Sequence, residues 1–458
     1  MIKVFNHYLH RRTLVQIGLD FGLILFTVLV VGLSISAPLK LLMPRVATHG
    51  LSLAACVLVI NTASGFYRNN HRRSLSQSCA RAVLALFLAL PLAWGIFSLL
   101  PMELASRAAM QQAAMFGVCA VIGLRVYAAH SASQSRTRIL ILGSGSAAAL
   151  VGQTLKQADP HAEVVGYLPT ANDGEPAVPT AGLLPAERSV ADTARELRVD
   201  EIVVALTERR GGNMPLRALL DCRLRGIRVY DLSSHFEKTL GQIRLNHINA
   251  GWLVFGEGFD QGPVRSVGKR AVDLVGSALL IVLLSPIVLL TALAIALEDG
   301  SPIFYRQERV GRHGRVFRVI KFRSMHTDAE RDGQPRWAAL RDTRVTQVGR
   351  FIRLARIDEL PQLLNVLRGE MSLVGPRPER PFFAERLARD IPYFALRQSL
   401  KPGITGWAQV RYQYGSTTED ALEKLQYDLY YMKNHSLFLD LAILFETVVV
   451  VLTGRGSR

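Results

Sequence analysis

Two adjacent carboxylates, Asp358 and Glu359, follow the basic residues Arg353 and Arg356. Such a pair can divide two tasks, one carboxylate attacking an electrophile and the other holding Mg²⁺. A helix N-terminus with arginines beside it also attracts phosphate groups. The alternative is structural, because Asp358 is placed to cap a helix that carries Pro361 in its first turn.

Basic clusters lie on both sides of this pair in the sequence. Before it, Lys321 and Arg323 alternate with apolar residues in the segment 317–325, which is typical of a strand that presents cations to phosphate. A solvated basic face near anionic lipid is the alternative for this segment. After the pair, Arg377 stands between two prolines that stiffen its backbone and favour bidentate phosphate contact. A rigid surface turn explains that segment equally well.

Residues 136–250 have the pattern of a Rossmann-like α/β domain. Alternating strands and helices predict a small parallel sheet covered by helices. The strands are expected near 138–142, 163–167, 201–206 and 227–232, and helices near 190–197 and 214–225. The turn Gly143-Ser144-Gly145 is similar to a dinucleotide site. Ala148 replaces its final glycine, so a tight turn in a regulatory or assembly domain is the favoured interpretation. Residues 233–264 show no clear period and predict a linker.

The apolar segment 271–297 is long enough to cross a bilayer, yet two features predict that it turns back. Ser285 and Pro286 lie near its middle, where proline removes a backbone hydrogen bond and breaks the helix. Each half is then roughly 20 Å long, short of the ~30 Å hydrocarbon core. Basic residues flank both ends, which favours the cytoplasmic side for each. We therefore predict a re-entrant helix; an ordinary fifth span with a kink is the alternative.

Four apolar stretches in residues 1–130 predict an N-terminal four-helix transmembrane bundle. Most are near the ~20 residues that a membrane helix needs. They occupy approximately 14–36, 51–66, 82–100 and 112–129. Lysine and arginine concentrate before the first stretch and between the second and third, which places the N-terminus in the cytoplasm. Four spans return the chain to the same side, so residues 136–458 are expected there too.

The overall composition agrees with a membrane protein that handles anions. Hydrophobic residues make up 49% of the 458, the mean hydropathy is +0.21, and the formal net charge is +17. The four cysteines and eleven histidines show no zinc-site or redox-pair spacing, which argues against a zinc enzyme. No motif indicates nucleic-acid binding. The positive charge is therefore assigned to membrane edges and to anionic substrates.

Five elements of residues 265–458 together resemble the bacterial sugar transferases, the monotopic polyprenyl-phosphate phosphoglycosyl transferases. In order they are the helix broken at Ser285-Pro286, then KFRSM, IDELPQLLNVLRGEMSLVGPRPE, KPGITGWAQV and YDLYYMKN. The N-terminal half is similar to that of the long exopolysaccharide-priming members. Residues 251–262 are similar to the subgroup associated with protein-sorting (PEP-CTERM) loci. The resemblance implies a membrane protein with a C-terminal α+β monotopic catalytic domain.

The same resemblance implies a reaction and roles for individual residues. A sugar-1-phosphate would pass from a UDP-sugar to undecaprenyl phosphate, with release of UMP. Asp358 would be the nucleophile that forms a phosphosugar–enzyme intermediate, and Glu359 would bind Mg²⁺. Phosphate and substrate binding would fall to basic and amide side chains, namely Lys321, Arg323, Arg353, Arg377 and Gln409.

Two other functions fit parts of the sequence. A membrane-bound sugar-nucleotide dehydratase or epimerase also joins four spans to a nucleotide-binding domain, but it needs a Tyr-x-x-x-Lys base. No tyrosine here has a lysine four residues later. A non-catalytic scaffold for polysaccharide assembly fits the N-terminal half alone.

The expected location is the bacterial inner membrane, with the lipid bilayer as a partner. The sugar, and whether the α/β domain binds a ligand or forms a homodimer, stay open.

Overall fold

The computed structural model forms two compact units, Leu9–Ile248 and Asn249–Arg458, with the few residues before Leu9 divided between them. The residues that it describes are 2–4, 7–9, 11–34, 51, 54, 55, 58, 115–117, 119, 120, 123, 136–159, 162–170, 173, 175–206, 214–247, 258, 259, 262–327, 342, 344–412, 415 and 417–452. Two short strands, β1 (Ile2–Val4) and β2 (His7–Leu9), pair with each other at the start of the chain.

The first predicted span forms a single helix. Helix α1 (Arg11–Ser34) has 24 residues and is therefore about 36 Å long, and its apolar part is the shorter segment Ile17–Thr27. The spans predicted at 51–66, 82–100 and 112–129 lie almost wholly outside the described residues. The four-helix bundle and the domain limit at residue 130 stay predictions.

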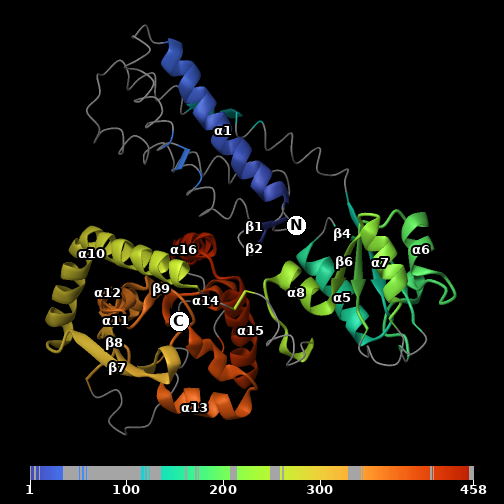
Figure 1. Cartoon of the computed structure of the whole chain (residues 1–458). Coiled ribbons are helices and arrows are strands. Elements are labelled where there is room, and N and C mark those ends of the chain that lie inside the picture. The colour runs from blue at the N-terminus through green and yellow to red at the C-terminus, as the bar shows by residue number, and fades with distance from the viewer. Residues whose placement is uncertain are drawn as a thin grey trace. The chain divides into compact units, whose positions relative to one another are not determined.

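The α/β region contains the predicted parallel sheet (Figure 1). Its order is β4-β3-β5-β6, and all three neighbouring pairs are parallel. The strands are β3 (Thr137–Leu142), β4 (Ala162–Leu168), β5 (Glu201–Val204) and β6 (Arg228–Asp231). The sequence predicted each of these strands to within two residues at either end, because short apolar runs bounded by turn residues mark buried strands.

Helices cover both faces of this sheet. They are α5 (Ser146–Ala158), α6 (Val190–Glu196), α7 (Leu216–Leu224) and α8 (Leu232–Leu240). Ile139 and Ile141 of β3 pack with residues of α5 and α8, whereas Leu140 and Leu142 pack with α6 and α7. Alternate strand residues point to opposite faces, so one apolar strand serves two helical layers. Burying each such side chain contributes roughly 1.5–3 kcal/mol.

Helix α8 corrects the prediction of a linker after residue 232. Asp231 caps the helix, since its Oδ1 accepts a hydrogen bond from the Ser234 amide at 3.0 Å. Gly241 ends it in a left-handed conformation, with φ of 64°. Its nine residues are too few for a clear apolar period, but the Asp and Gly signals at the two ends are those of a helix.

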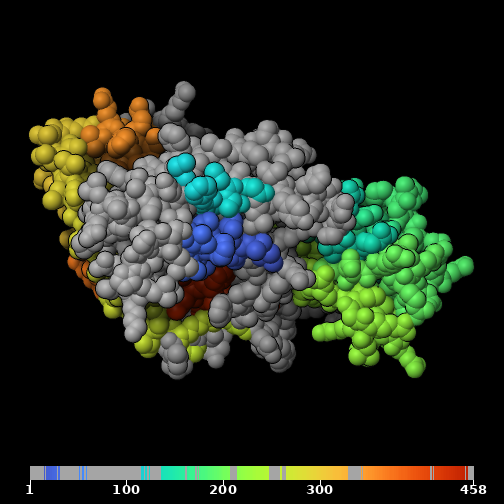
Figure 2. Space-filling model, turned by 90° about the horizontal axis from the view of Figure 1, so that it is seen from above, coloured from blue at the N-terminus to red at the C-terminus, as the bar shows by residue number. Residues whose placement is uncertain are grey.

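The second unit begins with the long apolar helix α10 (Pro263–Asp299), which turns sharply partway along (Figure 1). Pro286 lies inside it, and Ser285 Oγ donates to the Val282 carbonyl at 2.8 Å. In the part of the chain that the structure describes, Arg265–Asp299 is the one helix long and apolar enough to cross a membrane. Apolar side chains near its middle are exposed, with Val282 73% exposed, and Figure 2 shows atoms of this region (yellow) at the surface.

Both ends of α10 are bound to the same globular unit. Near its start, Lys269 Nζ donates to the Val374 carbonyl at 3.0 Å, and Asp273 Oδ1 accepts from the Leu373 amide at 3.0 Å. Near its end, the Glu298 carboxylate accepts from the Gln347 amide at 2.7 Å. A straight helix of 37 residues would separate its ends by about 55 Å. The bend is what lets one small unit hold both ends.

The rest of the unit is built from short elements around a hairpin. Strands β7 (Phe304–Val310) and β8 (Val316–Phe322) pair antiparallel. They are followed by α11 (Gln347–Leu354), the 3₁₀ helix η5 (Ile357–Gln362) and α12 (Leu363–Arg368). Strands β9 (Ser372–Val374) and β10 (Gly403–Thr405) form a separate parallel pair. The remaining helices are α13 (Pro381–Asp390), η6 (Phe394–Ser399), α14 (Trp407–Arg411), α15 (Thr418–Asn434) and α16 (Leu437–Leu452).

Candidate active site

The carboxylate pair lies on η5, between α11 and α12. Arg356 has a φ of 59°, so the chain leaves α11 through a left-handed residue and then enters the 3₁₀ turn. The predicted capping role of Asp358 is wrong, because α12 begins only at Leu363 and its N-cap, Gln362, makes no side-chain cap. The tight turn instead leaves Asp358 and Glu359 side by side with different surroundings.

Asn365 fixes this turn against the hairpin. Its Oδ1 accepts from the Ile320 amide at 3.0 Å, and its Nδ2 donates to the Arg318 carbonyl at 2.8 Å. Asn365 is fully buried, so these bonds are shielded from water and hold α12 beside β8. Lys321 follows Ile320 on β8, and it therefore reaches the carboxylates of η5.

Glu359 is surrounded by three cations. Its Oε1 accepts from Lys321 Nζ at 3.1 Å and from an Arg377 guanidinium nitrogen at 2.9 Å. Its Oε2 lies 3.8 Å from a nitrogen of Arg356. Burial alone would favour the neutral acid, since Glu359 is 7% exposed. The opposing charges of Arg377, Lys321 and Arg356 nevertheless hold the pKa of Glu359 below its usual range.

Asp358 differs from its neighbour because no described side chain binds it. It makes no hydrogen bond or ion pair within the part of the chain that the structure describes. Burial and the adjacent charge of Glu359 raise the pKa of Asp358 to about 6, against the opposing effects of Lys321, Arg377 and Arg353. The result is a carboxylate that is still ionised near neutral pH and that no described side chain binds.

Lys321 and Arg377 contact Glu359, and Arg353 is close enough for its charge to act on Asp358, while the predicted phosphate-binding role of all three stays a prediction. They come from α11, β8 and the loop after β9, which are far apart in the chain. Four cations, with Arg356 included, face two carboxylates, so the site has an excess of positive charge. Such a site is suited to a ligand that carries several negative charges, such as a diphosphate.

Arg323 and Gln409 make other contacts. Arg323 is buried, and one of its guanidinium nitrogens donates to the carbonyls of Asp299 and Gly300, each at 2.8 Å. It thereby caps the C-terminal end of α10. Gln409 Nε2 donates to the Ile404 carbonyl at 3.1 Å. The contacts seen are structural, and a phosphate- or substrate-binding role for either residue stays a prediction.

The arginines that hold the loop carrying Arg377 were not predicted from the sequence. Arg309 of β7 donates to the Pro378 carbonyl at 2.9 Å, and Arg397 of η6 donates to the Arg377 carbonyl at 2.9 Å. Their partners are backbone atoms 69 and 20 residues away. No motif or spacing in the chain marks such contacts.

The donor set admits Mg²⁺ only with help from a substrate. No group of three or more His, Cys, Asp or Glu side chains gathers in a metal-binding arrangement among the described residues. Two adjacent carboxylates are present, and Mg²⁺ sites commonly combine one or two carboxylates with substrate phosphate oxygens and water. Asp358 and Glu359 fit that type of site.

The glycine turn of the α/β region is filled by a carboxylate of the same chain. Asp173 Oδ2 accepts from the Ser144 amide at 2.9 Å and from the Thr170 amide at 2.9 Å. Gly143 has a φ of 121°, a conformation that an L side chain rarely adopts. Asp173 therefore uses a backbone donor that a bound pyrophosphate would otherwise have available.

Comparison with sequence families gives two matches. The model of the family described as bacterial sugar transferase matches residues 264–454, which contain all of α10 except its first residue and the whole carboxylate site. A model described as CoA-binding domain matches residues 62–215, which include β3, β4 and β5.

Three curated proteins illustrate the similarity. A UDP-N-acetylgalactosamine-undecaprenyl-phosphate N-acetylgalactosaminephosphotransferase of Aeromonas hydrophila is 40% identical over 262 residues, 57% of this chain and 61% of that protein. An undecaprenyl-phosphate glucose phosphotransferase of Komagataeibacter xylinus is 45% identical over 41% of this chain and 36% of its own length. A UDP-glucose:undecaprenyl-phosphate glucose-1-phosphate transferase of Caulobacter vibrioides is 47% identical over 43% of this chain and 75% of its own length. The matched part of the first two is thus less than two thirds of their length.

Proposed function

This chain belongs to the bacterial sugar transferase family, and on that premise we propose that it transfers a sugar-1-phosphate from a UDP-sugar to undecaprenyl phosphate. UMP is the other product, and the reaction primes exopolysaccharide synthesis. The observation that carries the proposal is the unpaired carboxylate of Asp358 beside Glu359, which three cations hold in place. A nucleophile and a positively charged cradle are the two parts that phosphoryl transfer requires.

The reaction proceeds in two displacements at one phosphorus atom. An oxygen of the ionised Asp358 attacks the β-phosphorus of the UDP-sugar. The bond from that phosphorus to the bridging oxygen breaks, and UMP leaves with the electron pair. A phosphate oxygen of undecaprenyl phosphate then attacks the same phosphorus and displaces the Asp358 carboxylate. Each displacement forms and breaks one P–O bond, so the enzyme returns to its starting state.

The cations stabilise charge on the moving phosphoryl group. Lys321 and Arg377 already share one oxygen of Glu359, and Arg353 lies near Asp358. Glu359 orients these cations before substrate binds, so little reorganisation remains for the transition state. Mg²⁺, held by Glu359 together with substrate phosphate oxygens, would neutralise further negative charge on the diphosphate.

The contacts of α10 support the predicted re-entrant helix and a monotopic catalytic domain. Both ends bind the same unit, while the apolar middle, which contains Ser285 and Pro286, is exposed to its surroundings. The hydrocarbon core of a lipid bilayer accommodates the exposed apolar side chains of such a helix. A helix that returns to the side it entered from keeps the active site in the cytoplasm. We propose a multi-pass protein of the bacterial inner membrane in which the N-terminal spans precede this dipping helix.

A UMP-release assay tests the reaction. Full-length protein in detergent or nanodiscs is mixed with undecaprenyl phosphate, Mg²⁺ and a panel of UDP-sugars. The expected result is repeated turnover with at least one UDP-sugar: many UMP molecules per enzyme when the lipid phosphate and Mg²⁺ are both present, and at most one UMP per enzyme without the lipid phosphate. No release with any UDP-sugar would overturn the proposal and favour a non-catalytic scaffold.

Labelling of single cysteines tests the topology. Cysteines introduced at Arg312 and at the exposed residue Glu385 should both react only with a probe that reaches the cytoplasm. Reaction of the cysteine at position 312 from the periplasmic side would contradict the re-entrant helix.

A further inference from the structure

The loop that presents Arg377 is held at four consecutive carbonyl groups. The Pro376 carbonyl accepts from the Gly403 amide, and the Glu379 carbonyl accepts from the Val310 amide, each at 2.9 Å. The two carbonyls between them accept from the side chains of Arg397 and Arg309, also at 2.9 Å. A four-residue loop with every carbonyl bound has little freedom to move, although it belongs to no helix or strand.

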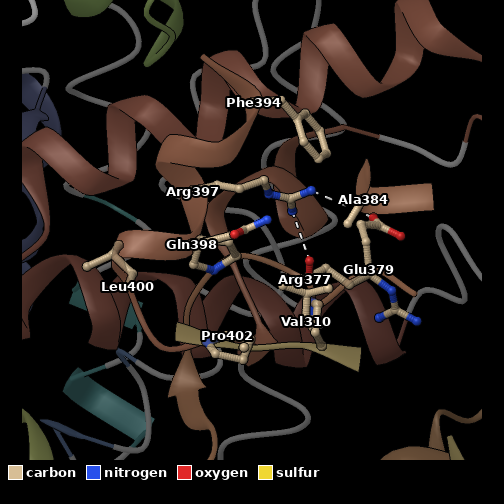
Figure 3. Close-up of a pocket in the computed structure, with 12 residues that line it drawn as sticks. Val310, Arg377, Glu379, Ala384, Phe394, Arg397, Gln398, Leu400 and Pro402 are labelled. Atoms are coloured by element: carbon tan, nitrogen blue, oxygen red, sulfur yellow. Dashed lines mark hydrogen bonds and ion pairs between the residues drawn. The ribbon is translucent and has the colours of Figure 1, made fainter. Parts of the chain in front are cut away.

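Arg397 is the most buried of the side chains that hold this loop. It lies on η6, is 8% exposed, and forms an ion pair of 2.8 Å with Asp428 of α15, which is 1% exposed. A second carboxylate, that of Glu379, lies 3.7 Å away. Figure 3 shows the Arg397 guanidinium beside Glu379 and the Arg377 backbone, in a shallow pocket that these residues line.

The charges around the loop fall into two groups. In the outer group, Arg309 and Arg397 form ion pairs with Glu379 and Asp428, so these four side chains together carry no net charge. The inner group around Asp358 has four cations against two carboxylates. The charges of these four side chains are used in pairing with one another and not in binding an anionic substrate. What it offers the site is geometry, because a buried, paired guanidinium is a rigid donor.

We propose that Arg397, itself oriented by Asp428, is a positioning residue that sets the place of Arg377 in the active site. The path is short and direct. Asp428 binds Arg397, Arg397 binds the backbone carbonyl of Arg377, and the Arg377 side chain binds Glu359. Arg397 needs no contact with substrate for this role. The role in turnover rests on the proposed phosphoglycosyl transfer, whereas the role in loop order does not.

Loss of the Arg397 side chain should lower kcat much more than it changes KM for the UDP-sugar. In Arg397→Gln the Arg377 carbonyl loses its donor and the loop is free to shift. A misplacement of about 1 Å at a group that stabilises a transition state costs on the order of 10²-fold. We expect a fall in kcat of about 10- to 100-fold, with a change in KM for the UDP-sugar of less than about threefold.

A double-mutant cycle separates positioning from a general structural role. If Arg397 acts through Arg377, the double variant Arg377→Ala/Arg397→Gln should be no less active than Arg377→Ala alone. If the two losses multiply, Arg397 acts by another route and the proposal is overturned. Asp428→Asn should repeat the effect of Arg397→Gln in the same direction, and Arg397→Lys should restore only part of it, because lysine lacks the planar fork.

Arg312→Gln is the matched control. Arg312 also donates to a backbone carbonyl, that of Ser399 at 3.1 Å, but it makes no hydrogen bond or ion pair with residues 376–379. Its kcat should stay within about twofold of wild type, as for an ordinary surface substitution. Thermal midpoints of all variants establish that activity is compared between folded proteins. An equal loss of kcat in Arg312→Gln would overturn the proposal.

Hydrogen exchange tests the loop without any turnover. Arg397→Gln should speed exchange in peptides that contain Arg377 and Glu379, and leave those of α5 unchanged. Unchanged exchange in the loop overturns the proposal even if activity falls. If wild type releases no UMP but the loop loosens as expected, the proposed function fails while the positioning contact stands.

Discussion

A buried glutamate held by cations occurs in both halves of this chain, at Glu201 in the α/β region and at Glu359 in the catalytic region. Glu201 opens β5 and is 2% exposed; Lys238 binds its Oε2, and Arg228 lies 2.9 Å from its Oε1. Glu359 is bound in the same manner by Lys321 and Arg377. Burial and ion pairing therefore do not by themselves distinguish a structural cluster from an active site.

The surroundings of the two glutamates differ in two respects. The Glu201 cluster is closed, because its Lys238 lies near a second carboxylate, that of Asp159, and also stacks 4.3 Å from the centre of the Tyr230 ring. The Glu359 cluster has surplus positive charge and, next to it, a carboxylate that no described group binds. An unpaired nucleophile and an unbalanced field are what a reaction needs, and a structural cluster has neither.

The largest effect should come from Asp358→Asn, which removes the nucleophile and leaves the cations in place. We expect UMP release to fall by at least about 10³-fold, with an unchanged or higher thermal midpoint because a partly buried charge is lost. Glu385→Gln, an exposed carboxylate on α13, is the control and should keep wild-type activity. Near-normal turnover in Asp358→Asn would mean that Asp358 is as structural as Glu201.

Glu359→Gln should lower both activity and stability. The change leaves Lys321 and Arg377 without their carboxylate, and uncompensated buried charge is costly. We expect turnover to fall by about 10²-fold and the free energy of unfolding to fall by about 3 kcal/mol. Denaturant titration and UMP release on the same preparation measure the two losses. Loss of stability with full activity would contradict a role for Glu359 in the site.

Glu201→Gln should lower stability alone. Because Arg228 is about half exposed, water compensates part of the loss, and we expect about 2 kcal/mol. The folded fraction should release UMP at the wild-type rate. A variant of Glu201 that folds but loses turnover would show that the α/β region takes part in catalysis.

Acid should weaken the α/β region through His235. This side chain is 1% exposed, and neither ring nitrogen has a hydrogen-bond partner among the described residues; burial, together with Lys238, lowers its pKa from 6.5 to about 3. Between pH 3 and 6.5, His235 is protonated in the unfolded chain but neutral in the folded chain. The free energy of unfolding is therefore highest above pH 6.5 and falls as the pH drops below it. The loss is up to about 1.4 kcal/mol per pH unit. Unfolding at pH 7, 6 and 5 measures it, and an equal slope in His235→Leu would rule out this source.

Much of the α/β region was predictable because its signals are local. The apolar runs at 138–142 and 201–206 are bounded by turn residues, and they form the central strands β3 and β5. The helix α8 was missed because nine residues are too short for periodicity to stand out. In the catalytic region, residue types alone indicated three features: the acidic pair, the Ser285-Pro286 break and the basic clusters.

The sequence by itself determined which groups were available: two adjacent carboxylates, several arginines and lysines, and an apolar segment interrupted by proline. Only the tertiary structure decided how they are used. Lys321 and Arg377 converge on Glu359 from 38 residues before and 18 residues after it, whereas Arg323, two residues beyond Lys321, caps α10 instead. Local spacing cannot encode such choices, because they depend on which backbone carbonyls and carboxylates distant elements bring within about 3 Å. The same holds for α10, whose bend follows from Pro286 but whose two ends are assigned to one unit only by long-range contacts.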